Sequence, residues 1–215
     1  RNELERGENN PDRIMWLNLL ANAFMAHPYH HPTIGWRSDV EGVPTERLKK
    51  FYQDFYYPNN ATLIVVGDLK SSDALKKIEH HFGQIKASAQ EIPQVYTQEP
   101  PQQGERRFEI RRPGQLGIVN MGYHVPPLEH QDSAALDVLQ GILSSGVSSR
   151  LHQTLVEKNL ALKASAWNAQ LRDPGLFTFS AKLASGVAHK TVEDVMLNEI
   201  DKLKKEDAAP GEMAR

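Results

Sequence analysis

The sequence predicts an α+β fold in which helices pack on antiparallel strands. Three features support this prediction: segments with apolar residues at helical spacing, short runs with the composition of strands, and a change of pattern at residues 84–104. Strands in antiparallel pairs, with helices grouped between them, are typical of a layered α+β domain. The length of 215 residues allows two such domains of roughly 100 residues each.

The part of the chain before this change is rich in predicted helices. The first ten residues are polar with helical spacing, and a helix with a broad apolar face follows at residues 11–24. Two more amphipathic helices are predicted at residues 45–55 and 72–83. Between them, the β-branched run ATLIVVG at residues 61–67 predicts a buried strand.

Residues 84–104 are rich in Gln, Pro, Ser and Thr, a composition that indicates a linker. After it, alternating patterns on either side of Pro113-Gly114 predict a β-hairpin of residues 106–112 and 115–123. Two helices are then predicted at residues 133–143 and 149–158. Two strands follow at residues 164–171 and 175–183, joined by a turn at Asp173-Pro174, and a last helix is predicted at residues 190–204.

The composition excludes several classes of function. There are 25 Lys and Arg residues against 27 Asp and Glu residues, so the net charge of −2 leaves no basic excess and nucleic acid is not an expected partner. The longest apolar runs are far shorter than the roughly 20 residues of a membrane span, so no span is expected in this segment. The absence of cysteine excludes disulfides, thiolate zinc sites, iron–sulfur clusters and cysteine nucleophiles.

The residues taken by themselves form no complete active site. Motifs for a nucleophile elbow, a phosphate loop and a dinucleotide site are absent. Three groups of histidines are candidate metal sites, but a solvated loop, the charge favoured at a helix end and a turn explain them more simply. These groups are His27, His30 and His31; Glu79, His80 and His81; and His124, Glu129 and His130.

Two further clusters have simple explanations. The serines of residues 144–149 could bind an anion at the start of the following helix, but capping of that helix is the simpler role. An aromatic cluster is better explained by core packing than by a cofactor site; it comprises Tyr52, Phe55, Tyr56 and Tyr57.

Several segments resemble the M16 family of zinc metallopeptidases, the pitrilysin, insulinase and mitochondrial processing peptidase type. In residues 46–83, a helix is followed by YYPNNATLIVVGD and by a helix that ends in Phe-Gly. HPY at 27–29 with PTIG at 32–35, GVSSRL at 146–151 and GLF at 175–177 are also typical of the family. Since these matches run in the right order through nearly the whole chain, it is identified as a member of this family.

The resemblance implies two M16-type layered units, each an antiparallel sheet packed by helices. Residues 1–88 would be the C-terminal part of the zinc-bearing domain, which is therefore incomplete, and residues 89–104 would be a linker. Residues 105–215 would form most of a second M16-like domain. We therefore expect the chain to be an internal fragment of a longer protease.

The resemblance also implies one zinc ligand. The family holds zinc by an H-x-x-E-H motif and a later glutamate, and Glu3 matches that later glutamate. Two imidazoles and one carboxylate leave a position for water, and the motif glutamate acts as general base. H-x-x-E-H is absent here, so no catalytic residue is assigned and the fragment alone is expected to be inactive. Without the alignment, Glu3 would be one solvated acid among Glu3, Glu5 and Glu8.

Substrate and partners also follow from the resemblance. We expect peptides or unfolded proteins, held by β-strand addition in a closing chamber, and the remaining domains of the same chain. The family's Arg and Tyr that grip the substrate are replaced here by Val156 and Leu162. In four-domain members of the family this pair belongs to the distant half of the protein, so its absence fits a position in the first half. The absence also leaves open a non-catalytic, structural or peptide-binding M16-like subunit. The resemblance leans toward a bacterial periplasmic or other extracytoplasmic location.

Overall fold

The computed structural model describes residues 2–114 and 116–213, which form two compact units. Unit 1 combines the residues up to Ile34 with those from Gln98 onward, and unit 2 is Gly35–Thr97. Each unit is described by itself below.

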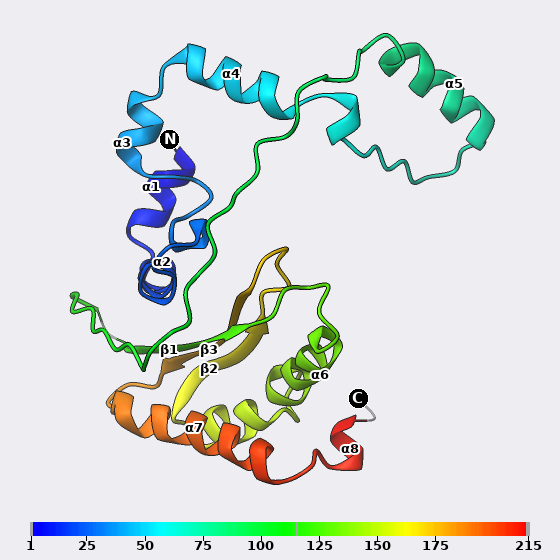
Figure 1. Ribbon diagram of the computed structural model, residues 1–215. Coiled ribbons are helices and arrows are strands. Elements are labelled where there is room, and N and C mark those ends of the chain that lie inside the picture. The colour runs from blue at the N-terminus through cyan, green and yellow to red at the C-terminus, as the bar shows by residue number, and fades with distance from the viewer. Residues whose placement is uncertain (1, 115, 214–215) are drawn as a thin grey trace. The chain divides into compact units, whose positions relative to one another are not determined.

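Unit 1 contains the sheet and most of the helices (Figure 1). Its elements in chain order are α1 (Asn2–Glu8), α2 (Pro11–Ala23), the 3₁₀ turn η1 (Pro28–His30), β1 (Ile118–Val125), α6 (Ser133–Ser144), the π-helical turn η3 (His152–Val156), β2 (Ala161–Asn168), β3 (Gly175–Leu183), α7 (His189–Lys205) and α8 (Pro210–Met213). Unit 2 contains α3 (Arg37–Gly42), α4 (Thr45–Phe55), the 3₁₀ turn η2 (Pro58–Asn60) and α5 (Ser71–Phe82).

The sheet of unit 1 is antiparallel with the strand order β1-β3-β2. Because side chains alternate along a strand, β3 supplies residues to both faces of the sheet. Phe177 and Phe179 belong to the main apolar cluster, with Val192 and Met196 of α7. Leu176 belongs to a second cluster with Leu19 of α2. The sheet thus has α6 and α7 on one face and α2 on the other (Figure 1).

Two helix ends follow the signals that the sequence indicated. Asn10 caps α2, since its side-chain oxygen accepts a hydrogen bond from Arg13 N, and Pro11 occupies the first helical position. Gly83 caps α5 through a bond from its N–H to Glu79 O. The α+β prediction is confirmed, because helices pack on an antiparallel three-stranded sheet.

The predicted β-hairpin is wrong. β1 begins at Ile118 and pairs with β3, and residues 106–112 form no strand; Gln115 lies outside the described residues. Successive side chains of this segment nevertheless contact different helices. Arg106 donates to carbonyls at the end of α2, whereas Arg107 pairs with Glu193 of α7. The alternating pattern therefore reflects contacts of successive side chains with two different helices. The segment is not a strand, because the ladder of backbone hydrogen bonds that defines one does not form.

The predicted buried strand at residues 61–67 is also wrong. These residues are in no strand, and Ile64 and Val66 are 79% and 90% exposed. A strand exists only by pairing with a neighbour, and no strand in the described ranges pairs with this run.

Smaller differences concern boundaries. The helix predicted at 149–158 is mainly the π-helical turn η3, and β2 begins three residues before the predicted range. The division into M16-type units at 1–88, 89–104 and 105–215 stays a prediction. Within residues 2–114 and 116–213, no helix has the length and apolar character needed to cross a membrane.

Candidate functional site

Glu3 lies in the first turn of α1, and its side chain is exposed. One turn later, Gly7 is buried, and a Cβ atom at this position would lie 2.4 Å from Arg13 Nε. Arg13 of α2 therefore packs directly against the backbone of α1, which positions the helix that carries Glu3.

The donor set of the described residues was tested against a zinc site. Residues 2–114 and 116–213 contain no group of three His, Cys, Asp or Glu side chains that could hold a metal ion. A catalytic zinc needs three protein ligands and an open position. Glu3 can therefore be at most one of the ligands, and these residues alone do not make a zinc site; its role as a ligand stays a prediction.

The chain reversal after α2 is held by an acid and a base that come from far along the sequence. Glu99 Oε1 accepts a hydrogen bond from Met25 N at 2.7 Å, and Oε2 accepts bonds from Ala26 N and His27 N at 2.8 and 2.9 Å. Arg106 Nη1 donates to Asn22 O and Ala23 O, at 2.7 and 3.0 Å. Arg106 thus satisfies carbonyls that the end of a helix leaves unpaired, and Glu99 satisfies N–H groups of the turn that follows it.

Glu99 is held as a carboxylate. Burial by itself would raise its pKa, but the hydrogen bonds from the N–H groups of His27, Met25 and Ala26, together with the nearby charge of His124, lower the pKa below its ordinary value of 4.5. No local pattern in the sequence indicates this contact, since Glu99 lies 72 to 74 residues from its partners.

His27 is the most buried residue of the predicted histidine groups, with 6% of its surface exposed. Its Nδ1 accepts a hydrogen bond from Tyr29 N at 3.2 Å, and its Nε2 lies 3.7 Å from Asp173 Oδ2. Asp173 N in turn donates to Tyr29 Oη at 3.3 Å. His27 thus connects η1 to the turn between β2 and β3, and both ring nitrogens have partners.

The other histidines make similar local contacts. His124 Nε2 lies 3.1 Å from Ala23 O, and His130 lies beside Asp132. His80 and His81 are exposed in the last turn of α5, where a positive charge is favourable. Across the described residues, none of the three histidine groups forms a metal site.

The loop of residues 144–149 uses hydroxyl donors for its own backbone. Ser144 Oγ donates to Gln140 O and Ala166 O, and buried Ser149 Oγ donates to Gly146 O. Gly146 has a φ of +76°, a conformation that favours glycine. These contacts give the serines a structural role, and neither hydroxyl needs an anion.

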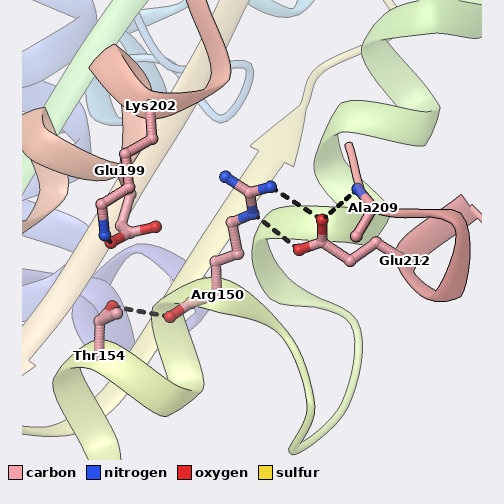
Figure 2. Close-up of polar contacts among 6 residues, drawn as sticks. All are labelled: Arg150, Thr154, Glu199, Lys202, Ala209 and Glu212. Atoms are coloured by element: carbon pink, nitrogen blue, oxygen red, sulfur yellow. Dashed lines mark hydrogen bonds and ion pairs between the residues drawn. The ribbon is translucent and has the colours of Figure 1, made fainter. Parts of the chain in front are cut away.

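A polar cluster near α7 joins Arg150, which lies just before η3, to α8 (Figure 2). Arg150 makes a bidentate pair with Glu212, with Nε–Oε1 and Nη2–Oε2 distances of 2.7 and 2.8 Å, and Ala209 N donates to the same carboxylate. Glu199 is 3% exposed and pairs with Lys202 at 2.6 Å. A surface cavity of about 600 Å³ lies between η3 and α7, but its lining carries charges of both signs and indicates no particular ligand.

The positions that match the family's substrate-gripping pair are apolar in the structure as well. Val156 ends η3, and Leu162 lies in β2 with 59% of its surface exposed. Neither side chain can donate a hydrogen bond to a peptide.

Comparison with known proteins places the chain in a family. A family model described as the peptidase M16 inactive domain matches residues 43–215. Zinc protease PqqE of Helicobacter pylori is 34% identical over 211 residues, which are 97% of this chain and 48% of that protein. The chain belongs to the M16 peptidase family. It spans about half the length of the relatives it matches.

Solved structures support the same assignment. The crystal structure of a protease from Helicobacter pylori has a TM-score of 0.92 at 33% identity and is matched over 96% of this chain and 51% of that one. A peptidase M16 inactive domain from Pseudomonas fluorescens has the same fold, with a TM-score of 0.82 at 21% identity over 97% of this chain and 50% of that one. The resemblance found in the sequence is therefore confirmed. Relatives of this M16 chain are named zinc proteases, which implies zinc in the family.

Proposed function

We propose that this M16 chain is part of a zinc-dependent metalloendopeptidase that cleaves peptides or small unfolded proteins inside a closing chamber. The observation that carries the proposal is its 34% identity, over 97% of its length, to a relative named zinc protease. Glu3 would be one of three protein ligands, and an H-x-x-E-H motif elsewhere in the same protein would supply the other two and the general base. The chain alone is expected to be inactive.

The residues of this chain have two tasks in that proposal. Gly7 and Arg13 hold α1 against α2, and this packing fixes the helix that presents Glu3. The sheet also has an edge to offer to substrate: the order β1-β3-β2 leaves the outer edge of β1 without a strand partner in the described ranges, whereas α6 side chains already bond Ala166 O and Asn168 N on β2. An extended peptide can add to such an edge through main-chain hydrogen bonds.

The proposal is tested in the intact protein with Glu3→Gln and, as a matched control on the same exposed helix, Glu5→Gln. We expect Glu3→Gln to lose bound zinc, measured by mass spectrometry of the metal after gel filtration, and to lose cleavage of a fluorogenic peptide. Glu5→Gln is expected to keep both. Full zinc occupancy in Glu3→Gln would contradict the role of Glu3, and cleavage unaffected by a chelator would contradict the zinc mechanism.

A second function is favoured by one observation. Val156 and Leu162 stand where the family's substrate-gripping Arg and Tyr are expected, so the parent protein could be a non-catalytic, structural or peptide-binding subunit. Peptide binding without cleavage by the intact protein would support this alternative. Cleavage that a chelator abolishes and zinc restores would exclude it. A bacterial periplasmic or other extracytoplasmic location stays a prediction from the resemblance.

A further inference from the structure

The sheet face that carries α2 presents its side chains in rows across the three strands. The register places Gly122, Thr178 and Trp167 in one row, and α2 covers this row with Leu19 and Trp16. The next two rows are Asn120, Ser180 and Ser165, and then Ile118, Lys182 and Lys163. No acidic residue occurs in the strand positions of this face. We call the last two rows the lysine–serine patch.

Two lysines stand directly opposite each other in this patch. Lys163 of β2 pairs in register with Lys182 of β3, and side chains opposite each other on antiparallel strands share a face. Like charges in this arrangement destabilise a sheet. Neither lysine forms an ion pair within the residues that the structure describes. The register of β2 is interrupted between Ala161 and Lys163, and such bulges redirect side chains and occur next to functional sites.

The adjacent row is polar, and its side chains make no hydrogen bond to the residues that the structure describes. Asn120 Oδ1 is buried and accepts no hydrogen bond from the described residues. The hydroxyls of Ser180 and Ser165, on the same row and only half-buried, also make no hydrogen bond there. Native proteins satisfy nearly all buried polar groups, so Asn120 Oδ1 is an exception, and the two half-buried hydroxyls of its row are available as donors.

We propose that the lysine–serine patch binds the carboxylate of a peptide. Two ammonium groups and two hydroxyls are donors suited to an oxyanion, and charge-assisted bonds of this kind are the strong ones. This inference rests on the proposed function for its choice of ligand, and it narrows the substrates to peptides with a carboxylate placed to reach the sheet face.

The test is binding of labelled peptides to the intact protein by fluorescence anisotropy, with a chelator present to prevent cleavage. Three neutral-sequence peptides are compared: one with a free C-terminal carboxylate, the same peptide as a C-terminal amide, and an amide that contains a single Glu. The variant is Lys163→Gln with Lys182→Gln, and Lys158→Gln is the control, since Lys158 is an exposed lysine outside the sheet.

We expect the double variant to weaken binding of the free-acid peptide at least tenfold and to leave the amide unchanged. Its melting temperature should stay equal or rise, because a like-charge pair is removed. The Glu-containing amide shows whether a side-chain carboxylate serves as well as the terminal one.

Three results would overturn the inference. The wild type could bind the free-acid peptide and the amide with equal affinity, or the double variant could bind as the wild type does. The third result is a lower melting temperature of the double variant together with an equal loss of affinity for both peptides. Competition by inorganic phosphate without any peptide discrimination would assign the patch to a free anion instead. Because zinc is removed in these measurements, they test the patch independently of cleavage. The inference can fail while zinc-dependent cleavage is confirmed, and it can hold while zinc-dependent cleavage is refuted.

Discussion

Replacement of Glu99 by Ala is expected to destabilise unit 1 by about 2 kcal/mol. The carboxylate accepts three backbone N–H bonds after α2, and a hydrogen bond to a charged group contributes about 1.5–3 kcal/mol. Met25 is 67% exposed, so water can replace the carboxylate at its N–H, which leaves two bonds to count. Since Glu99 is itself only half-buried, solvent screening reduces their sum by roughly half.

The effect of Glu99→Ala should depend on pH in one direction. The pKa of Glu99 is lowered in the folded protein, against the opposing influence of burial, by bonds from His27, Met25 and Ala26. A lowered pKa means that the folded state favours the carboxylate, so this stabilisation is complete above the ordinary pKa of 4.5. It is lost as the pH falls through the folded pKa. The stability difference between wild type and Glu99→Ala should therefore shrink below about pH 4.5.

Urea unfolding followed by tryptophan fluorescence measures this effect. Trp16 and Trp167 lie 5.7 Å apart across α2 and β2, so their emission reports the packing of α2 on the sheet. Trp36→Phe removes the signal of unit 2. Glu91→Ala is the control, because Glu91 is an exposed acid in the same stretch. A difference below about 0.5 kcal/mol at pH 7, or one that stays constant in acid, would refute the reasoning.

Two further predictions concern single positions of unit 1. Arg150→Lys cannot keep both bonds to Glu212, so we expect thermal unfolding to show a loss of stability of about 1–2 kcal/mol and trypsin to cleave faster near α8. Unchanged cleavage would contradict the view that this pair holds α8 in place. Asn159 has a φ of +55°, so Asn159→Ala should lower the free energy of unfolding by about 1 kcal/mol, whereas Asn159→Gly should be neutral or stabilising. Equal melting temperatures for both variants would argue against backbone strain at this turn.

The sequence was informative where local pattern and packing agree. Residues 189–205 show apolar spacing at the helical period, and α7 buries Val192 and Met196 as that pattern predicts. The strand at Gly175–Leu183 was predicted with its observed bounds, because apolar residues alternate with polar ones after the Asp173-Pro174 turn. Local pattern failed for residues 61–67 and 106–112, because a strand depends on a partner that the run itself does not specify.

The candidate site was predictable only in part. Glu3 came from a resemblance, and its role as a ligand stays a prediction. Glu99 and Arg106 could not be found, because each contacts residues more than 70 positions away. The lysine–serine patch has a signal in the sequence: residues 163–165 are Lys-Ala-Ser and residues 180–182 are Ser-Ala-Lys. Antiparallel pairing of two such mirrored segments brings like residues into register.

The like-charge pair is more informative than a favourable contact would be. Sequences that fold well are locally consistent with their fold, so a conflict that is not relieved nearby points to a requirement other than stability. Lys163 lies on an outer strand, where many polar residues would be tolerated, and Lys182 opposite it has no acidic neighbour on the strand positions of that face. A bound carboxylate between the two would turn the repulsion into attraction, so the patch should be more stable when occupied than when empty. Protection of β2 amides from hydrogen exchange by the free-acid peptide, and not by its amide, is the consequence that a purely structural role does not share.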